Sequence, residues 1–187
     1  MGLSQTPQAL VPASLASGSN WSLLNSGGTS LTGADTITIS GISNKSKILV
    51  LINEASGTST GSGIGVRLNS DTAGNYYSWG QRILASSTYT SGNLTSWAEP
   101  SVTYIQIGTM ANNATSTVSG YCLIDGCTST GVKTFTASGG AAAGGGVSQS
   151  LITQGGYYNS STVISSVSIY NSNANFDAGT VYVYASA

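Results

Sequence analysis

Few of the familiar catalytic arrangements can be built from the residue types in this chain. The 187 residues include no histidine, so neither a serine–histidine–aspartate nor a cysteine–histidine arrangement can form. Carboxylate chemistry, as in glycoside hydrolysis, needs two acids flanking one bond. The six acids are Asp35, Glu54, Asp71, Glu99, Asp125 and Asp177. The aspartates at 71, 125 and 177 stand in turn-forming contexts and both glutamates at expected strand ends. We therefore expect no enzyme, with a glycosidase-like use of Glu54 or Glu99 as the alternative.

Metal binding is the second chemistry to consider. The side chains of Asn69, Asp71 and Asn75 offer oxygen ligands suited to calcium. However, a single carboxylate is a weak ligand set for this ion, and an Asx-type turn explains the same residues. Cys122 and Cys127 cannot close a tetrahedral zinc site by themselves. They could form a disulfide across the turn between them, although a reducing compartment favours two small buried thiols. We expect no metal and no cofactor.

The charge content is the most informative feature of the composition. Charged residues make up 6% of the chain, hydrophobic residues 40%, and the formal net charge is −1, against about a quarter charged residues in an ordinary soluble domain. Copies would therefore repel one another little at high concentration. The five cations, Lys45, Lys47, Arg67, Arg82 and Lys133, form no basic patch, so nucleic acid is not an expected partner.

No membrane association is expected, because no stretch approaches the roughly 18 apolar residues of a spanning helix. Residues 1–19 interleave glutamine, proline and serine with apolar residues, unlike the continuous apolar core of a secretory signal. We therefore expect the chain to be made and assembled in the cytoplasm, or exported by machinery that does not read signal peptides.

Strand patterns dominate the chain, and helix patterns are almost absent. Residues 36–40 alternate apolar with polar, and residues 47–53 form a continuous apolar run typical of a strand buried on both faces. Further strands are expected at 64–68, 76–84, 102–108, 117–124, 133–137, 147–153, 163–170 and 180–184, separated by turn-forming residues. These spacings predict one all-β domain over residues 31–187, an antiparallel, jelly-roll-like β-sandwich.

Residues 1–30 show no periodic apolar face, and we expect a short extended N-terminal arm, with residues 1–20 docked on the domain itself or on a neighbour. The arm and the aromatic clusters supply the candidate interface residues: Leu3, Leu10, Val11, Leu15, Trp21, Tyr157 and Tyr158. Aromatic side chains of this kind serve cores, subunit interfaces and sugar sites alike. The glycine-rich run 139–146 is either a mobile loop or a loop that contacts another subunit.

Four segments carry a resemblance to a known family. They are TITISGI (36–42), KILVLI (47–52), VRLNSDTAGNYY (66–77) and FDAGTVYVY (176–184). In this order they resemble a β-sandwich module of tailed-bacteriophage virion proteins, a family that includes capsid decoration (cement) proteins and the terminal domains of tail fibres. The likeness covers about residues 35–187 and contains no active-site motif.

The resemblance implies a jelly-roll-like domain that commonly associates as homotrimers on the virion. No shaft segment precedes the module in this sequence, which favours a decoration protein on the capsid surface, assembled in the host cytoplasm. Its expected partners are the major capsid protein and copies of itself, and its expected action is to stabilise the shell by burying apolar surface. The alternative is a tail or tail-fibre-tip adhesin that binds host surface glycan through exposed tyrosine and tryptophan.

Overall fold

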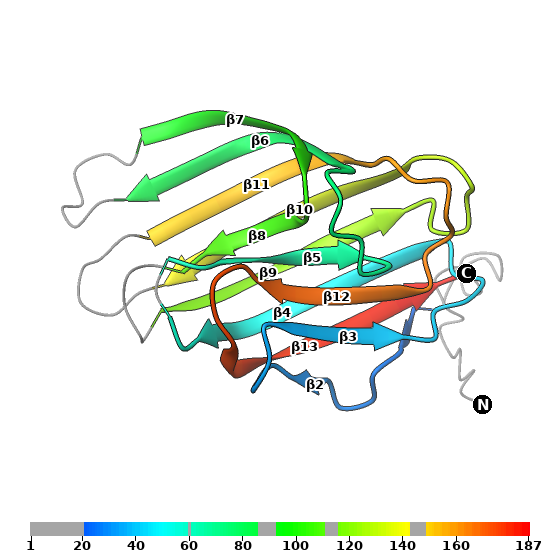
Figure 1. The fold of residues 1–187 in the computed structure, drawn as a ribbon, viewed down its shortest axis with the longest axis horizontal. Coiled ribbons are helices and arrows are strands. Elements are labelled where there is room, and N and C mark those ends of the chain that lie inside the picture. Colours follow the sequence, from blue (N-terminus) through cyan, green and yellow to red (C-terminus); the bar gives the residue numbers. More distant parts are fainter. Residues whose placement is uncertain (1–20, 60, 86–92, 111–115, 143–148) are drawn as a thin grey trace, which may run out of the picture.

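A computed structural model of the chain describes residues 21–59, 61–85, 93–110, 116–142 and 149–187, and these residues form two antiparallel sheets that pack face to face (Figure 1). This confirms the predicted all-β, antiparallel β-sandwich. The larger sheet contains β1 (Ser22–Leu23), β2 (Thr29–Ser30), β4 (Lys47–Gly57), β6 (Tyr76–Ala85), β7 (Asn93–Val102), β9 (Thr117–Asp125), β10 (Lys133–Ala142), β11 (Gln149–Tyr158) and β13 (Phe176–Ser186). The smaller sheet contains β3 (Thr36–Ser40), β5 (Gly63–Leu68), β8 (Ile105–Thr109) and β12 (Ser166–Asn171).

The chain crosses repeatedly between the two sheets. The order of the larger sheet is β1-β13-β4-β9-β10-β11-β6-β7, with β2 also paired to β13, and the order of the smaller one is β3-β12-β5-β8. In Figure 1 the smaller sheet lies in front of the larger one and covers only part of it, so β6 and β7 extend beyond it. Within the described part of the chain, no helix could span a membrane.

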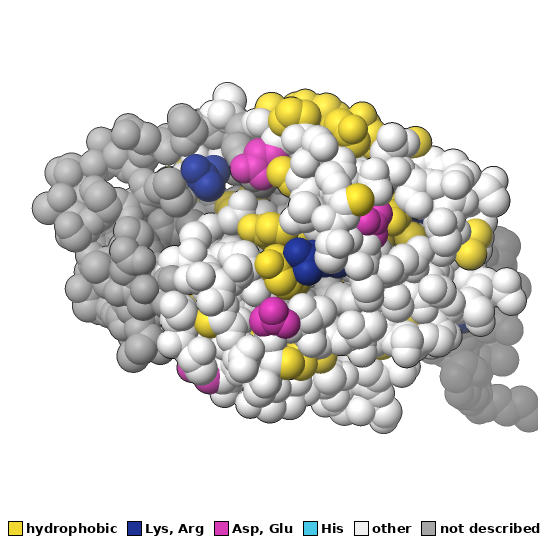
Figure 2. All heavy atoms as spheres, in the orientation of Figure 1, with side chains coloured by type: hydrophobic (Ala, Val, Ile, Leu, Met, Phe, Trp, Pro, Cys, Tyr) yellow, Lys and Arg dark blue, Asp and Glu magenta, His cyan; other side chains and the backbone are white. Residues whose placement is uncertain are grey.

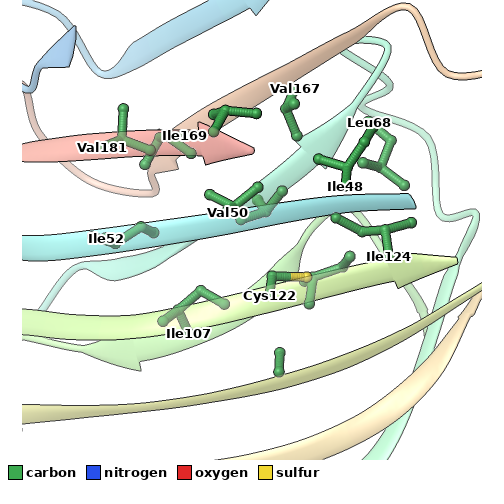
Figure 3. Packing of buried hydrophobic residues seen from close by; sticks show 14 of the residues in the cluster. Ile48, Val50, Ile52, Leu68, Ile107, Cys122, Ile124, Val167, Ile169 and Val181 are labelled. Atoms are coloured by element: carbon green, nitrogen blue, oxygen red, sulfur yellow. The ribbon is translucent and has the colours of Figure 1, made fainter. Parts of the chain in front are cut away.

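One continuous core lies between the sheets. From the larger sheet, alternate residues of β4 and β9 point inward, and from the smaller sheet those of β5 and β12 do the same (Figure 3). The fully buried members that meet there are Ile48, Val50, Ile124, Val66, Leu68, Val167 and Ile169.

Cys122 and Cys127 are both buried and unbonded, which confirms the prediction of two small buried thiols. Burial raises the pKa of Cys127 to about 12, so the thiolate is not the resting form.

The predicted start of the sandwich at residue 31 was wrong. Strands β1 and β2 both pair with β13, in the registers Ser22↔Ala185 and Thr29↔Val181. The Asn25 side chain strengthens this edge, because its Oδ1 accepts from the Val183 N–H at 2.8 Å and its Nδ2 donates to the Val181 carbonyl at 2.8 Å. Residues 22–30 therefore belong to the larger sheet, and residues 1–20 of the expected arm lie outside the described residues.

Two strand predictions also need correction. The sequence suggested one strand at 102–108, but the chain forms β7 up to Val102 and a separate strand, β8, from Ile105. Residues 139–142 of the glycine-rich run, expected as loop, extend β10: residues 139–141 pair with Leu151 and its neighbours, and Ala142 pairs with Thr117. Residues 143–146 of that run lie outside the described residues.

Candidate functional site

The outer face of the larger sheet carries apolar side chains that the core does not use. Residues 47–53 were expected to be buried on both faces, but only Ile48, Val50 and Ile52 are buried, while Leu49 and Leu51 are half-buried. The sheet register makes two cross-strand rows from β13, β4 and β9: Tyr182–Leu51–Tyr121 and Tyr184–Leu49–Leu123. Tyr121 is 41% exposed. We call these six residues the tyrosine–leucine rows.

A second apolar group lies on the same face, over β6 and β11. The rings of Tyr77 and Tyr157 stack with centroids 4.7 Å apart, and Trp79 lies 5.7 Å from Tyr157. Trp79 is 51% exposed, and Leu151, on the same face of β11 and four residues from the pairing partner of Trp79, is 50% exposed. We call Tyr77, Trp79 and Tyr157 the outer aromatic cluster, which contains one of the predicted interface residues.

Uncharged side chains connect these two groups. The outward positions of β10 between them are Thr134, Thr136 and Ser138, and none of the outward side chains named so far carries a charge. Lys47 and Asp125 continue the outward positions of β4 and β9 beyond Leu49 and Leu123, and they form an ion pair at 2.8 Å at the end of the sheet. Figure 2, which looks onto the opposite face, is mostly white with a few separated charged side chains. The outer face is therefore suited to packing against another uncharged surface.

Tyr158 was predicted at an interface, but the structure places it in the core with 2% of its surface exposed. Its ring stacks on Tyr76 at 4.7 Å, on the inner face of the same two strands whose outer face carries Tyr77 and Tyr157. The Tyr158 hydroxyl donates to Asp71 Oδ2 at 2.8 Å, and the Tyr76 hydroxyl accepts from the Leu68 N–H at 2.8 Å. Burial raises the Tyr76 pKa well above its usual range.

The candidate calcium residues form a structural turn. Asp71 Oδ1 accepts from the Ala73 N–H at 2.7 Å, the Asx-turn contact, and Oδ2 accepts from Asn75 Nδ2 at 2.8 Å as well as from Tyr158. Asn69 Oδ1 accepts from the Ser165 N–H at 2.8 Å. Both Asp71 carboxylate oxygens and the Asn69 amide oxygen thus accept hydrogen bonds, and within the described ranges no three acids or cysteines come together as metal ligands would.

We expect the stability of the protein to fall in acid partly through Asp71. Although burial raises its pKa, hydrogen bonds from Asn75, the Ala73 N–H and Tyr158 outweigh this and lower the pKa below the ordinary 3.8. The stabilisation is complete above 3.8 and is lost as the pH falls through the lower folded pKa. Denaturant unfolding across this range should show a shallower acid slope for Asp71→Asn than for the natural protein. Equal slopes would contradict the prediction.

The outer face of the smaller sheet holds a polar stack that the sequence did not reveal. The Arg67 guanidinium carbon lies 3.4 Å from the centre of the Tyr170 ring, and its Nε donates to the Thr103 carbonyl at 3.0 Å. Tyr104 meets the edge of Tyr170 at 5.4 Å. A side chain at Gly63 or Gly65 would collide with Tyr104. The two glycines in alternate positions of β5 were the one sequence signal for this arrangement.

The two glutamates lie inside long strands instead of at strand ends. Glu54 has a φ of 52° at an irregularity of β4, and Glu99 adjoins an irregularity of β7. Five strand spacings of about 4.8 Å separate these strands, roughly 24 Å. This is far beyond the roughly 5–9.5 Å between paired glycosidase carboxylates. Asp177 accepts a hydrogen bond from Ser56.

The remaining predicted interface residues are in or next to the N-terminal arm. Trp21 is the first described residue, half-buried at the start of β1, and Leu3, Leu10, Val11 and Leu15 lie outside the described residues.

No protein-family model, curated protein or solved structure matches this chain. The outer face of the larger sheet is therefore the candidate functional site on the evidence of its own residues.

Proposed function

We propose that this protein is a structural component of a tailed-bacteriophage particle, a decoration protein that stabilises the capsid by binding its major subunits. The observation that carries the proposal is the outer face of the larger sheet, where the tyrosine–leucine rows and the outer aromatic cluster present exposed apolar surface between hydroxyl side chains. Trp79 and Tyr121 are 51% and 41% exposed, and aromatic side chains of this kind are enriched in protein interfaces. Such a face is suited to being covered by a partner.

The proposed action is burial of apolar surface. Each Å² of apolar surface removed from water contributes about 25 cal/mol, and many weak contacts repeated around a shell add up through multivalency. The aromatic side chains suit this role because they bury a large area for little lost side-chain freedom. The near absence of charge lets copies stand close together without repulsion.

The test introduces a glutamate at each of two apolar positions whose side chains are equally exposed. Leu151 on the outer face and Val132 in the β9–β10 turn are each 50% exposed. If the face binds capsid, Leu151→Glu should reduce occupancy on purified particles by about tenfold or more, because it buries an unpaired charge, and Val132→Glu should leave it unchanged. Occupancy is measured by gel densitometry against the major capsid protein. Full occupancy by a folded Leu151→Glu protein would refute the proposal.

The outer aromatic cluster also favours a second candidate, an adhesin at the tail that binds a neutral host glycan. An exposed indole beside stacked phenols can pack against the apolar face of a sugar ring. Copy number separates the two candidates, since hundreds of copies per particle indicate the shell and a handful indicate the tail. Loss of glycan binding in Trp79→Ala, with capsid occupancy unaffected, would support the adhesin.

A further inference from the structure

A cavity of about 340 Å³ opens at the end of the sandwich where β3 ends and β12 begins, on the right in Figure 1. Ile42, Cys127 and Ile164, all buried, contribute apolar surface to it. Asn44 and Val163 also line it, and Val163 is 45% exposed. No lining side chain is charged. The cavity is large enough for one or two aliphatic side chains and too small for a folded element.

Backbone hydrogen bonds fix the walls of this cavity. The Ile42 N–H donates to the Ser165 carbonyl at 3.0 Å, and the Ile164 N–H donates to the Cys127 carbonyl at 2.8 Å. The Cys127 N–H in turn donates to the Ser46 carbonyl at 2.9 Å, which joins this wall to the start of β4. Three segments far apart in the sequence are thereby held together around the cavity.

The N-terminal segment enters the described structure at the same end. Ser22 pairs with Ala185, whose neighbour Ser186 pairs with Lys47, and Lys47 pairs with Asp125, two residues before Cys127. Three strand spacings of about 4.8 Å, roughly 14 Å, therefore separate the start of β1 from the wall of the cavity. Six extended residues span roughly 20 Å. A side chain at position 15 can reach the cavity from Trp21.

Residues 1–20 also match the cavity in chemistry. They contain no charged residue, and their large apolar side chains include Leu10, Val11 and Leu15. We propose that the cavity binds an apolar side chain from residues 10–15 of the same chain, with Leu15 as the anchor. The tether favours this occupant, because a short connection gives an effective concentration in the millimolar range that a separate molecule would have to exceed.

Disulfide trapping in the full chain tests this placement. Leu15→Cys puts a thiol on the proposed anchor, and Cys127 supplies its partner on the cavity wall. Under mild oxidation, we expect an intramolecular bond between position 15 and Cys127, identified by peptide mass spectrometry. Leu3→Cys is the matched control and should form this bond at least tenfold more slowly. Cys122, buried in the core, should remain unbonded in both variants.

The two ways of failing are distinct. Equal rates for Leu15→Cys and Leu3→Cys would overturn the proposal, and a bond that forms only between molecules would show that a second copy is the occupant. Hydrogen exchange provides an independent measurement that needs no new thiol. Leu15→Ser should speed exchange of the Ile42 and Ile164 amides several-fold, while Leu3→Ser should leave their exchange rates unchanged. Equal exchange rates in the two variants would contradict the role of Leu15 as the anchor. Neither experiment depends on capsid binding, so this inference and the proposed function can fail separately.

Discussion

Lys133→Ala is expected to lower the free energy of unfolding by about 2–4 kcal/mol, one of the largest effects of any single substitution in this chain. Lys133 has no exposed surface. Its ammonium donates to the Gly131 carbonyl at 2.8 Å and to the Ser160 carbonyl at 2.7 Å, which ties the β9–β10 turn to the segment after β11. The substitution removes both hydrogen bonds and leaves a cavity in place of the three methylene groups beyond Cβ and the ammonium group.

Two further variants separate these causes. Lys133→Met keeps most of the buried volume and removes only the hydrogen bonds, so it should cost about half as much. Lys47→Ala removes a lysine that is 52% exposed in its pair with Asp125, and should cost less than about 1 kcal/mol. Urea unfolding followed by tryptophan fluorescence measures all three. If Lys133→Met were as stable as the natural protein, the hydrogen bonds would only offset the desolvation of the ammonium, and the prediction would be wrong.

Gly156→Ala is expected to destabilise the larger sheet by about 3 kcal/mol or to prevent folding. A Cβ at this position would collide with the Tyr77 carbonyl oxygen and would lie 2.6 Å from Cζ of Phe135 and 2.9 Å from the Ser78 Cα. Two of these atoms belong to the backbone of the neighbouring strand, β6. The strands would have to separate before the methyl group fits.

The adjacent glycine provides the matched control. A Cβ at Gly155 has only one neighbour, the Phe135 carbonyl oxygen at 3.6 Å, an ordinary contact. Gly155→Ala should therefore change stability by less than about 1 kcal/mol, in the stabilising direction, because alanine restricts the unfolded chain more than glycine does. Thermal unfolding of both variants measures the difference. A Gly156→Ala protein as stable as Gly155→Ala would show that the strands are not as close as described.

The fold class was predictable because alternation of apolar residues fixes which face of a strand is buried. Residues 36–40 and 181–184 alternate, and the structure places Ile39, Val181 and Val183 in the core. What alternation does not show is whether the other face is covered. Leu49 and Leu51 follow the same apolar run as Ile48 and Val50, and only the tertiary arrangement leaves them on an outer face.

Strand β7 was missed for a related reason. Its sequence, Asn93–Val102, contains Glu99 and Pro100, residues that disfavour a central strand. Proline is tolerated here because β7 is an edge strand and because its pairing with β6 shifts register between Tyr76 and Ser78. Local propensity could not reveal an irregular edge strand.

The candidate site was only partly predictable. The sequence identified Tyr157 and Tyr158 as a pair, but adjacent residues in a strand point to opposite faces, so one joins the outer aromatic cluster and the other the core. The rest of the site is assembled by register between strands distant in sequence. Tyr182, Leu51 and Tyr121 form one row although Leu51 lies 70 residues before Tyr121 and Tyr121 lies 61 residues before Tyr182, and no local pattern contains that information.

The irregular strand β7 and the two-residue strands β1 and β2 mark the two margins of the larger sheet. Pro100 offers no N–H, Ser101 has a φ of 63°, and the opposite margin provides only short stretches of straight backbone. Both margins are thus poor templates for adding a further chain by β-pairing. In a protein with so little charge to keep its copies apart, these margins reduce the risk that larger sheets join edge to edge into fibrils.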